Sequence, residues 1–382
     1  MKIEERPLRE YLYKRPQIEN NVCNYCKSNN IFNGRCEDCL KKNITLYYSL
    51  RNIEIKNHIL KTEFNLSLKQ KKASKFFLEH YINKKNAYLN AVCGSGKTEI
   101  MYEVILYALN KGDKVLIAIP RKEIVFELYK RLKNVFINTT IKYIDGKNHD
   151  DNGELLISTI NQLIHYENEF DLIILDEVDA YPYQENEYLE RLVKKSLKTD
   201  GVIFKMSATE KEKIDSDKYI INRRYHNYDL EYPIFIKDNS KKIDENEKLK
   251  EILLNNNRKI IIYTYSIRKS QEIADYFGCE YVNSKNKRSK EIISSFKNNR
   301  SNILVSTTIL ERGITIPNLD VVILDAENRV FSYQTIIQIC GRVGRSSTDR
   351  MGRIYIFYKY YSLKFLKVKR YIKQMNYEMQ DL

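Results

Sequence analysis

The sequence predicts an α/β protein with two tandem domains, each built on a parallel β-sheet, and a small zinc-binding module in front of them. Three observations support this. Short apolar runs alternate with helical stretches in two separate series, a polar break divides the series, and four of the seven cysteines fall in one short window. Strand–helix alternation implies parallel sheets covered by helices on both faces. A chain of 382 residues accommodates two such domains at about 100–200 residues each.

The composition is that of a folded protein with a basic surface. Apolar residues make up 43% of the chain, and the formal net charge is +15. No apolar run approaches the ~18–20 residues of a membrane span. The charged N-terminus MKIEERPLRE is unlike a secretory signal, so we expect a cytoplasmic protein. The surplus of cations favours phosphate backbones as partners. The codon bias of an AT-rich genome is an alternative source of the abundant Lys.

The chain divides into five predicted segments. They are a polar segment (1–20), a four-cysteine zinc module (21–42), a connector with a helix expected around Leu46 to Leu60 (43–65), a first α/β domain (66–235) and a second α/β domain (236–382). The polar break lies near residues 210–245.

Apolar runs of four to six residues give the expected strands. In the first domain they are Ala87–Val92, Lys114–Ile119, Leu155–Ser158, Asp171–Leu175 and Val202–Met206. In the second they are Lys259–Tyr263, Ile303–Ser306, Val321–Leu324 and Ile354–Tyr358. Helical periodicity follows several of them, as in Thr98–Asn110 and Glu123–Leu132.

The clustered cysteines have the spacing of a metal site. Cys23, Cys26, Cys36 and Cys39 form two C-x-x-C pairs separated by a short loop. Two such pairs can close a tetrahedral Zn²⁺ site of four thiolates, which leaves no open position for water. We therefore predict a structural zinc. Redox pairs or free thiols are the alternative. The other three cysteines are expected to be small buried hydrophobes.

A phosphate-binding loop lies between the first strand and its helix. The segment Cys93-Gly94-Ser95-Gly96-Lys97-Thr98 ends in Gly-Lys-Thr, as a P-loop does. Backbone amides of Gly94, Ser95 and Gly96 can surround a phosphate at the helix N-terminus. Lys97 can reach the β- and γ-phosphates of ATP, and Thr98 can ligate Mg²⁺. Upstream, the side-chain amide of Gln70 can read the adenine edge, or it is an ordinary surface glutamine.

Two further motifs follow strands of the first domain. Asp176-Glu177-Val178-Asp179 comes directly after an apolar strand, where carboxylates meet ligands in open α/β sheets. We expect Asp176 to hold Mg²⁺ and Glu177 to position or deprotonate the attacking water. Ser207-Ala208-Thr209 ends the last strand and resembles the coupling motif of superfamily 2 helicases.

The second domain carries the expected arginine finger. In the segment 338–345, Gln338 is followed by Arg342 and Arg345, which are three residues apart and would lie on one face if the segment is helical. Such an arginine stabilises the transition state of phosphoryl transfer and contributes about 10³–10⁵ in rate. Arg345 is the first choice for the finger and Arg342 the second. We also assign Gln338 to catalysis and Gly313 to nucleotide binding.

Together these motifs resemble the ComFA family of competence proteins, related to the helicase PriA. The resemblance rests on Lys97-Thr98-Glu99, on the acidic box continued by Ala180-Tyr181-Pro182, and on the segments 307–313 and 338–346. It extends over roughly residues 20–360. Asn161 departs from the pattern, which has His there. The resemblance implies two RecA-like domains, ATP hydrolysis with Mg²⁺ stimulated by single-stranded DNA, and the uptake of transforming DNA through a membrane channel.

The same resemblance implies partners and a nucleic-acid path. The partners are single-stranded DNA, the competence proteins ComFC and DprA, the uptake channel at the cytoplasmic face of the membrane, and further copies of the chain. A translocase grips the backbone with amides, hydroxyls and cations. The expected contacts are Pro120, Arg121, Thr159, Gln162, Thr307 and Thr308.

Two other functions are open. A PriA-like replication-restart helicase has the same motor, although that family carries its cysteines within the second motor half. The other possibility is a protein that is not a motor, namely a zinc-containing adaptor whose ATPase core is degenerate. The intact Lys97, Asp176, Glu177 and Arg345 argue against it.

Overall fold

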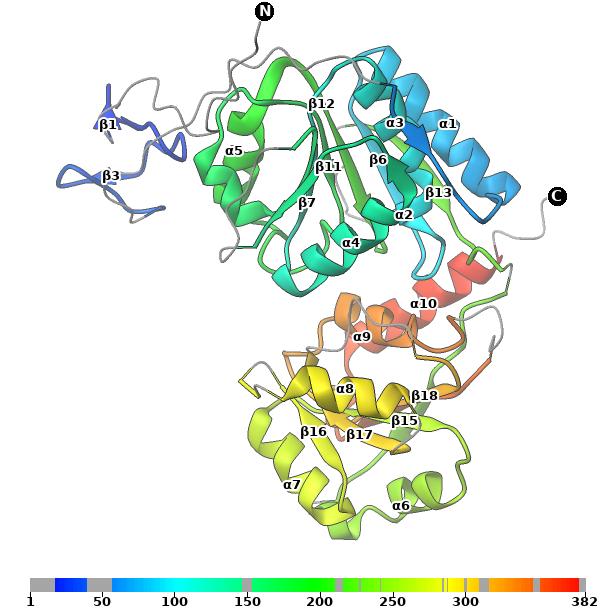
Figure 1. Ribbon diagram of the computed structural model, residues 1–382. Coiled ribbons are helices and arrows are strands. Elements are labelled where there is room, and N and C mark those ends of the chain that lie inside the picture. Colours follow the sequence, from blue (N-terminus) through cyan, green and yellow to red (C-terminus); the bar gives the residue numbers. More distant parts are fainter. Residues whose placement is uncertain are drawn as a thin grey trace, which may run out of the picture. The chain divides into compact units, whose positions relative to one another are not determined.

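The computed structural model describes residues 18–39, 57–145, 153–209, 216–226, 228–240, 242–283, 285–286, 288–298, 301–308, 316–345 and 351–377, apart from the side chains of Glu123 and Lys290. These residues form two compact units (Figure 1). The first runs to Ile221, and the second begins at Asn222 and also includes the loop Val92–Gly96. This division falls earlier in the chain than the domain boundary predicted at 235/236.

The first unit contains a seven-stranded sheet in which every pair of neighbouring strands is parallel. The strand order is β13-β6-β12-β11-β7-β10-β9. The bounds are β6 Ala87–Ala91, β7 Val115–Ile119, β9 Ile141–Ile144, β10 Leu155–Thr159, β11 Phe170–Leu175, β12 Leu197–Ser207 and β13 Asp217–Ile221. Its central strands are apolar on both faces, because helices cover both.

Helices separate onto the two faces of this sheet (Figure 1). Helices α1 (Leu68–Ile82), α3 (Tyr102–Asn110) and α4 (Lys122–Val135) cover one face. The 3₁₀ helix η1 (Ile160–His165) and α5 (Glu187–Ser196) cover the other. The predicted helix after the phosphate loop consists of α2 (Lys97–Ile100) and α3, separated at one residue.

The second unit has a six-stranded, fully parallel sheet. Its order is β14-β19-β18-β15-β17-β16. The strands are β14 Ile234–Lys237, β15 Lys259–Tyr263, β16 Glu280–Val282, β17 Ile303–Ser306, β18 Leu319–Ile323 and β19 Ile354–Tyr358. Helices α8 (Ser289–Lys297), α9 (Tyr333–Cys340) and α10 (Leu363–Tyr377) pack on one face, and α6 (Glu247–Leu254) and α7 (Ile267–Phe277) on the other. A 3₁₀ turn, η2 (Ile243–Glu245), precedes α6.

The structure adds to or differs from the sequence analysis in two connecting segments. The break at 210–245 contains β13 and β14, each an edge strand of one sheet. Both carry charged residues beside apolar ones, as solvent-facing edges do, and so lack a continuous apolar run. The expected helix around Leu46 to Leu60 is contradicted where it is described, because β5 (Ile59–Leu60) pairs with β8 (Phe136–Ile137). The rest of that helix lies outside the described residues.

The cysteine module consists of two small antiparallel hairpins. In the first, β1 (Ile18–Glu19) pairs with β2 (Val22–Cys23), and in the second β3 (Ile31–Phe32) pairs with β4 (Arg35–Cys36). The second hairpin turns at Asn33 and Gly34, both with positive φ, as two-residue hairpin loops require. Module and first sheet belong to one compact unit.

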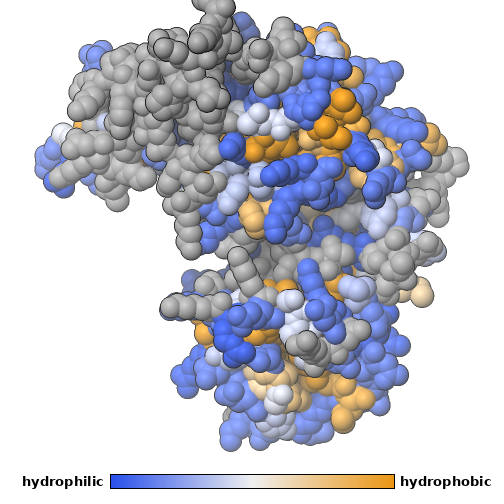
Figure 2. Space-filling view, viewed as in Figure 1, coloured by the Kyte–Doolittle hydropathy of each residue, from blue (hydrophilic) through white to orange (hydrophobic). Residues whose placement is uncertain are grey.

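The surface is mainly hydrophilic on the face that Figure 2 shows, with hydrophobic patches between charged areas. This matches a chain in which 30% of residues are charged. Among the described helices, none combines the length and apolar character needed to cross a membrane.

Candidate ATP and nucleic-acid site

The predicted site residues of the first unit lie along one edge of its sheet. All strands are parallel, so the loops that follow them meet at the carboxyl edge. Strands β6, β12, β11, β7 and β10 are consecutive there. The motifs therefore occur in the order phosphate loop, Ser207–Thr209, Asp176–Asp179, Pro120–Arg121 and Thr159–Gln162. The residues predicted to bind nucleotide group at one end of this series, and those predicted to bind nucleic acid group at the other.

The phosphate loop has the backbone that its glycines allow. Gly94 and Gly96 have φ values of +82° and +77°, which side chains with a Cβ rarely adopt. Lys97 begins α2, and its Nζ donates to the carbonyl oxygen of Ala91 at 2.9 Å, back across the loop. Thr98 follows, and its hydroxyl lies 3.4 Å from Nη1 of Arg131, which also pairs with Glu99.

The acidic box begins where β11 ends. The Asp176 amide donates to the Ala118 carbonyl at 3.1 Å, and the Glu177 amide donates to Asp176 Oδ1 at 2.8 Å. Burial raises the pKa of Asp176 to about 6, and the nearby Glu177 carboxylate raises it further against the opposing effect of Lys97. A buried carboxylate next to another carboxylate suits a divalent cation, which would stabilise both charges. Asp176 and Thr98 are thus appropriate ligands for Mg²⁺.

A hydrogen bond joins the acidic box to the end of β12. Thr209 Oγ1 donates to Asp179 Oδ2 at 2.8 Å, and both residues are buried. Ser207 Oγ in turn donates to the Thr209 carbonyl at 2.7 Å. The Val178 amide also donates to the Met206 carbonyl. The Ser-Ala-Thr motif is therefore connected to the carboxylates by side-chain and backbone contacts.

In the second unit, α9 holds Gln338 and ends at Cys340, so Arg342 and Arg345 lie in the turns after it and do not share a helical face. Gln338 and Arg342 are buried, while Arg345 is half-buried just after the helix. Within this unit, Cys93 Sγ lies 3.1 Å from Gln338 Oε1. Gly313 lies outside the described residues. Thr307 and Thr308 follow β17 and are half-buried.

The other predicted residues of the first unit differ in their burial and hydrogen bonding. Gln70 is 5% exposed, so it is not a surface residue, and its Oε1 accepts from the Ser67 amide in the N-terminal cap of α1. Arg121 caps α4, next to the buried Pro120. Thr159 is buried, and Gln162 in η1 has an Oε1 atom without a hydrogen-bond partner.

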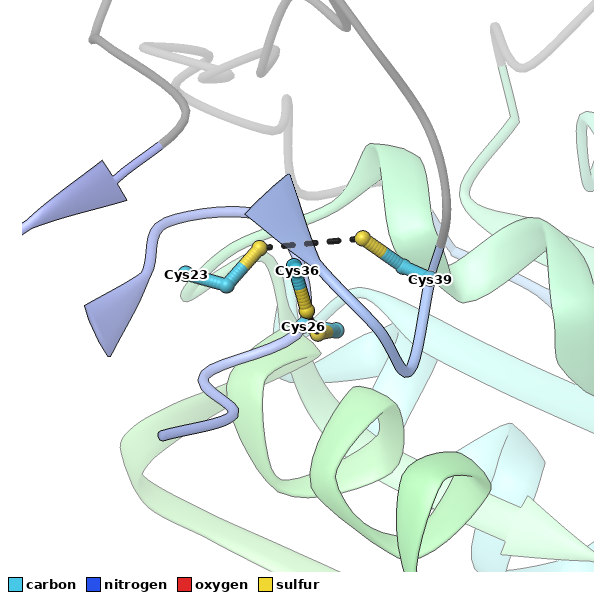
Figure 3. A group of neighbouring side chains, drawn as sticks. All are labelled: Cys23, Cys26, Cys36 and Cys39. Atoms are coloured by element: carbon cyan, nitrogen blue, oxygen red, sulfur yellow. Dashed lines mark hydrogen bonds between the residues drawn. The ribbon is translucent and has the colours of Figure 1, made fainter. Parts of the chain in front are cut away.

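The four cysteines of the module converge (Figure 3). Their sulfurs all lie within 4.8 Å of one another, with Cys23 and Cys39 at 3.7 Å and Cys26 and Cys36 at 3.5 Å. A tetrahedral site with Zn–S bonds of about 2.3 Å requires sulfurs at similar separations. A hydrogen bond with Cys26 lowers the pKa of Cys23 to about 5, whereas the pKa of Cys26 is raised. Four buried sulfurs at these separations form a donor set that fits zinc.

Buried Lys195, which no motif signalled, joins the module to the first sheet. Its Nζ donates to the carbonyls of Tyr25 in the module and Ile164 in η1, at 2.8 and 2.6 Å. Desolvation lowers the pKa of this ammonium to about 7. Lys27 adds an ion pair with Glu167, after η1, at 2.9 Å. The module thus contacts the segment that contains Gln162.

Arg191 pairs with Asp38 across the same junction. The four cysteines and Tyr25 also share a core with α5 and η1. Because Lys195 and Arg191 sit in an ordinary helix, only the structure identifies their partners.

Comparison with known families agrees with this architecture. Residues 63–212 match the family described as "Type III restriction enzyme, res subunit", and residues 244–347 match the helicase conserved C-terminal domain. The chain is 32% identical over 371 residues to the competence protein ComFA of Streptococcus pneumoniae, covering 90% of this chain and 86% of the relative. The chain belongs to the ComFA family. ComFA of Bacillus subtilis is also 32% identical, over 81% of this chain and 72% of the relative.

Solved structures show the fold that ComFA members share with other helicases. Dbp5 of S. cerevisiae bound to RNA and ADP BeF3 superposes with a TM-score of 0.58, at 16% identity, over 83% of this chain and 93% of that one. RecG bound to a three-way DNA junction gives 0.57 at 18% identity, over 84% and 47%. The predicted fold class and family are confirmed. The chain is a superfamily 2 ATP-dependent helicase or translocase in competence, and its helicase domains imply the use of ATP and Mg²⁺.

Proposed function

We propose that this protein is a single-stranded-DNA translocase that drives transforming DNA into the cytoplasm. The supporting observation is the order of motifs along the edge of the first sheet. The residues predicted to bind nucleotide follow strands at the β6 end of the sheet edge, and those predicted to bind nucleic acid follow β7 and β10. The Asp179–Thr209 hydrogen bond joins two motifs within the nucleotide end. A motor needs both groups on one sheet, because hydrolysis at one end has to change the grip at the other.

Each group has a defined role in the proposed cycle. Lys97 holds the β- and γ-phosphates, Asp176 and Thr98 hold Mg²⁺, and Glu177 orients the attacking water. Binding of ATP brings Arg342 and Arg345 onto the γ-phosphate, with Gln338 beside them, and hydrolysis releases them. Mg²⁺ supplies charge neutralisation at the phosphates. Gln70 and Gly313 complete the nucleotide site.

The proposed nucleic-acid contacts follow β7 and β10 in the first unit and β17 in the second. Arg121 offers a cation, and Thr159, Thr307 and Thr308 offer hydroxyls to successive phosphates. Pro120 and Gln162 complete the predicted contacts. The family resemblance adds ComFC, DprA, other copies of the chain and the uptake channel at the cytoplasmic face of the membrane as partners.

Steady-state ATP hydrolysis tests this proposal. It is measured without nucleic acid and with single-stranded DNA, duplex DNA or RNA. We expect single-stranded DNA to give the strongest stimulation, and stimulation that falls with added salt, because phosphate contacts release counterions. Stimulation mainly by RNA or duplex DNA would contradict the proposed role in DNA uptake. It would still be consistent with an ATP-driven motor.

The Lys97→Ala variant tests the nucleotide site. We expect it to lose at least about 10²-fold in hydrolysis, because the only lysine of the phosphate loop contacts the transferred phosphate. Lys75→Ala, an exposed lysine on α1, is the matched control and should retain wild-type turnover. Undiminished hydrolysis by a folded Lys97→Ala variant would rule out this site.

A PriA-like replication-restart helicase is the second candidate, since it would use the same motor. Unwinding of a forked duplex separates the two functions. ATP-dependent strand separation on a fork would favour the helicase. Movement along single strands without separation would favour the translocase.

A further inference from the structure

Arg224 is a buried cation with most of its hydrogen-bonding capacity unused. It lies just after β13, at the beginning of the second unit, and is 2% exposed. Its Nη1 donates to the carbonyl oxygen of Gly344 at 2.6 Å. Its Nε and Nη2 atoms have no hydrogen-bond partner. Such a side chain is uncommon, because buried guanidinium groups are normally paired.

The charge of Arg224 is not fully compensated, because burial and Arg345 disfavour it more than Cys93, Glu231 and Cys340 favour it. Among the described residues, none forms an ion pair with the guanidinium, and the nearby Arg345 adds a second positive charge. Burial lowers the pKa of Arg224, and Arg345 lowers it further. A buried cation with unpaired donors, next to a second cation, is unfavourable unless an anion joins them.

The surroundings of Arg224 identify the kind of anion. A Cβ atom built on Gly94 would lie 3.5 Å from Cγ of Arg224 and 3.6 Å from Cγ of Arg345. The stems of the two arginines therefore lie beside Gly94 of the phosphate loop, within one compact unit. Also, the Tyr225 amide donates to the Gly94 carbonyl at 3.1 Å, which holds the segment with Arg224 against the loop.

A purely structural role does not explain Arg224. The Gly344 carbonyl, which it contacts, also has His226 Nε2 at 3.0 Å as a donor. That carbonyl keeps a partner without Arg224. The unused Nε and Nη2 atoms instead form the two-donor edge with which arginine binds phosphate.

The geometry points to Arg224 as a further phosphate-binding residue, which acts with Arg345 on the terminal phosphate of the bound nucleotide. This inference rests on the nucleotide site of the proposed function. A nucleic-acid phosphate has the same chemistry. The contact of both arginines with Gly94 favours the nucleotide.

Equilibrium nucleotide binding without nucleic acid tests this assignment. The dissociation constants of Mg·ADP and of the non-hydrolysable analogue with an imido β,γ-bridge are measured for wild type, Arg224→Met and Arg224→Lys. We expect Arg224→Met to weaken the triphosphate analogue about tenfold and ADP by less than about twofold, because one charge-assisted contact to the terminal phosphate is lost. Arg224→Lys should recover part of the loss, since it keeps the charge without the fork.

Arg223→Met is the matched control, because it removes the same charge from the neighbouring position. It should leave both constants unchanged. A thermal melt shows whether each variant is folded, and Arg224→Lys serves if Arg224→Met is not. Equal affinities of wild type and a folded Arg224 variant for the triphosphate would overturn the inference. So would a selective loss of affinity for single-stranded DNA.

These results are separable from the proposed function. A wild-type protein that binds ATP with the expected dependence on Arg224, but is not stimulated by single-stranded DNA, would support Arg224 and contradict the DNA translocase. A wild-type protein that binds no ATP would overturn both.

Discussion

Lys195 and Arg224 are both almost excluded from solvent, but their surroundings differ. The ammonium of Lys195 donates to two backbone carbonyls, one from the cysteine module and one from η1. The guanidinium of Arg224 donates to one carbonyl and leaves Nε and Nη2 unpaired. The folded chain therefore supplies two acceptors to the ammonium of Lys195. Among the described residues, it supplies none to Nε and Nη2 of Arg224.

The difference indicates separate purposes for the two regions. A buried cation that donates to backbone carbonyls of two elements holds those elements together, and its removal leaves their carbonyls unpaired. A buried cation with unpaired donors destabilises the protein when no anion is bound. A bound anion offsets that cost. The junction of the cysteine module is therefore structural, while the arginine pair is prepared for a ligand.

Removal of the metal should have the largest effect. We expect chelation of zinc to unfold the module, because four crowded thiolates need a cation, and so to deprive Lys195 of the Tyr25 carbonyl. The first unit should lose several kcal/mol of stability, of the order of a broken buried network. Hydrogen exchange should then accelerate in η1 and α5. It should stay unchanged in α9, which belongs to the second unit.

An apo protein with full protection in η1 and α5 would show that the module is an independent appendage. Adding back Zn²⁺ should restore protection in the same segments. This reversal is the control for irreversible damage during chelation.

Replacement of the two cations should have opposite consequences for stability. We expect Lys195→Met to destabilise the protein by about 2–4 kcal/mol, because the carbonyls of Tyr25 and Ile164 lose their donor. Arg224→Met should change stability by less than about 1 kcal/mol, because an apolar side chain replaces an unpaired charge. Urea denaturation measures both values.

Lys194→Met, at an exposed neighbouring position, is the control for the loss of one charge and should have little effect. The comparison would fail if Arg224→Met were the more destabilising of the two. It would also fail if Lys195→Met remained destabilising by the full amount in the zinc-free protein, since metal loss already removes one of its two contacts.

The sequence was sufficient for those features that depend on local pattern. The phosphate loop, the acidic box and the cysteine spacing place their chemistry within a few consecutive residues, so Lys97, Asp176 and Cys23 could be named in advance. The central strands were recognisable for the same reason, because parallel strands covered on both faces are continuously apolar. The structure confirms this fold class.

Features that depend on distant partners could not be predicted in this way. Lys195 occupies a position in an ordinary amphipathic helix, and Arg224 stands in a polar stretch between two edge strands. Nothing in their neighbours along the chain indicates that one meets Tyr25 and Ile164 and the other Gly344. Gln70 is a different case, because its side chain completes a local capping box with Ser67 at the start of α1.

The same comparison extends to two carboxylates of the acidic box, where the smallest effect is expected. Asp179 receives a hydrogen bond from Thr209, whereas Asp176, with its pKa raised to about 6 mainly by burial, is suited to a cation. A raised pKa means that Asp176 binds a proton as the pH falls through about 6, and the proton competes with Mg²⁺. The apparent affinity for Mg²⁺ in ATP hydrolysis should therefore fall a few-fold between pH 7.5 and pH 5.5, by about tenfold per pH unit at most.

Saturating Mg²⁺ should displace this midpoint to lower pH, because metal binding releases the proton. Asp179→Asn should leave the pH dependence in place, since its role is the bond to Thr209, while Asp176→Asn should abolish metal-dependent hydrolysis. Initial rates across a grid of pH and Mg²⁺ concentration provide the measurement. A midpoint that does not move with Mg²⁺ would assign the titration to another group and remove the distinction between the two carboxylates.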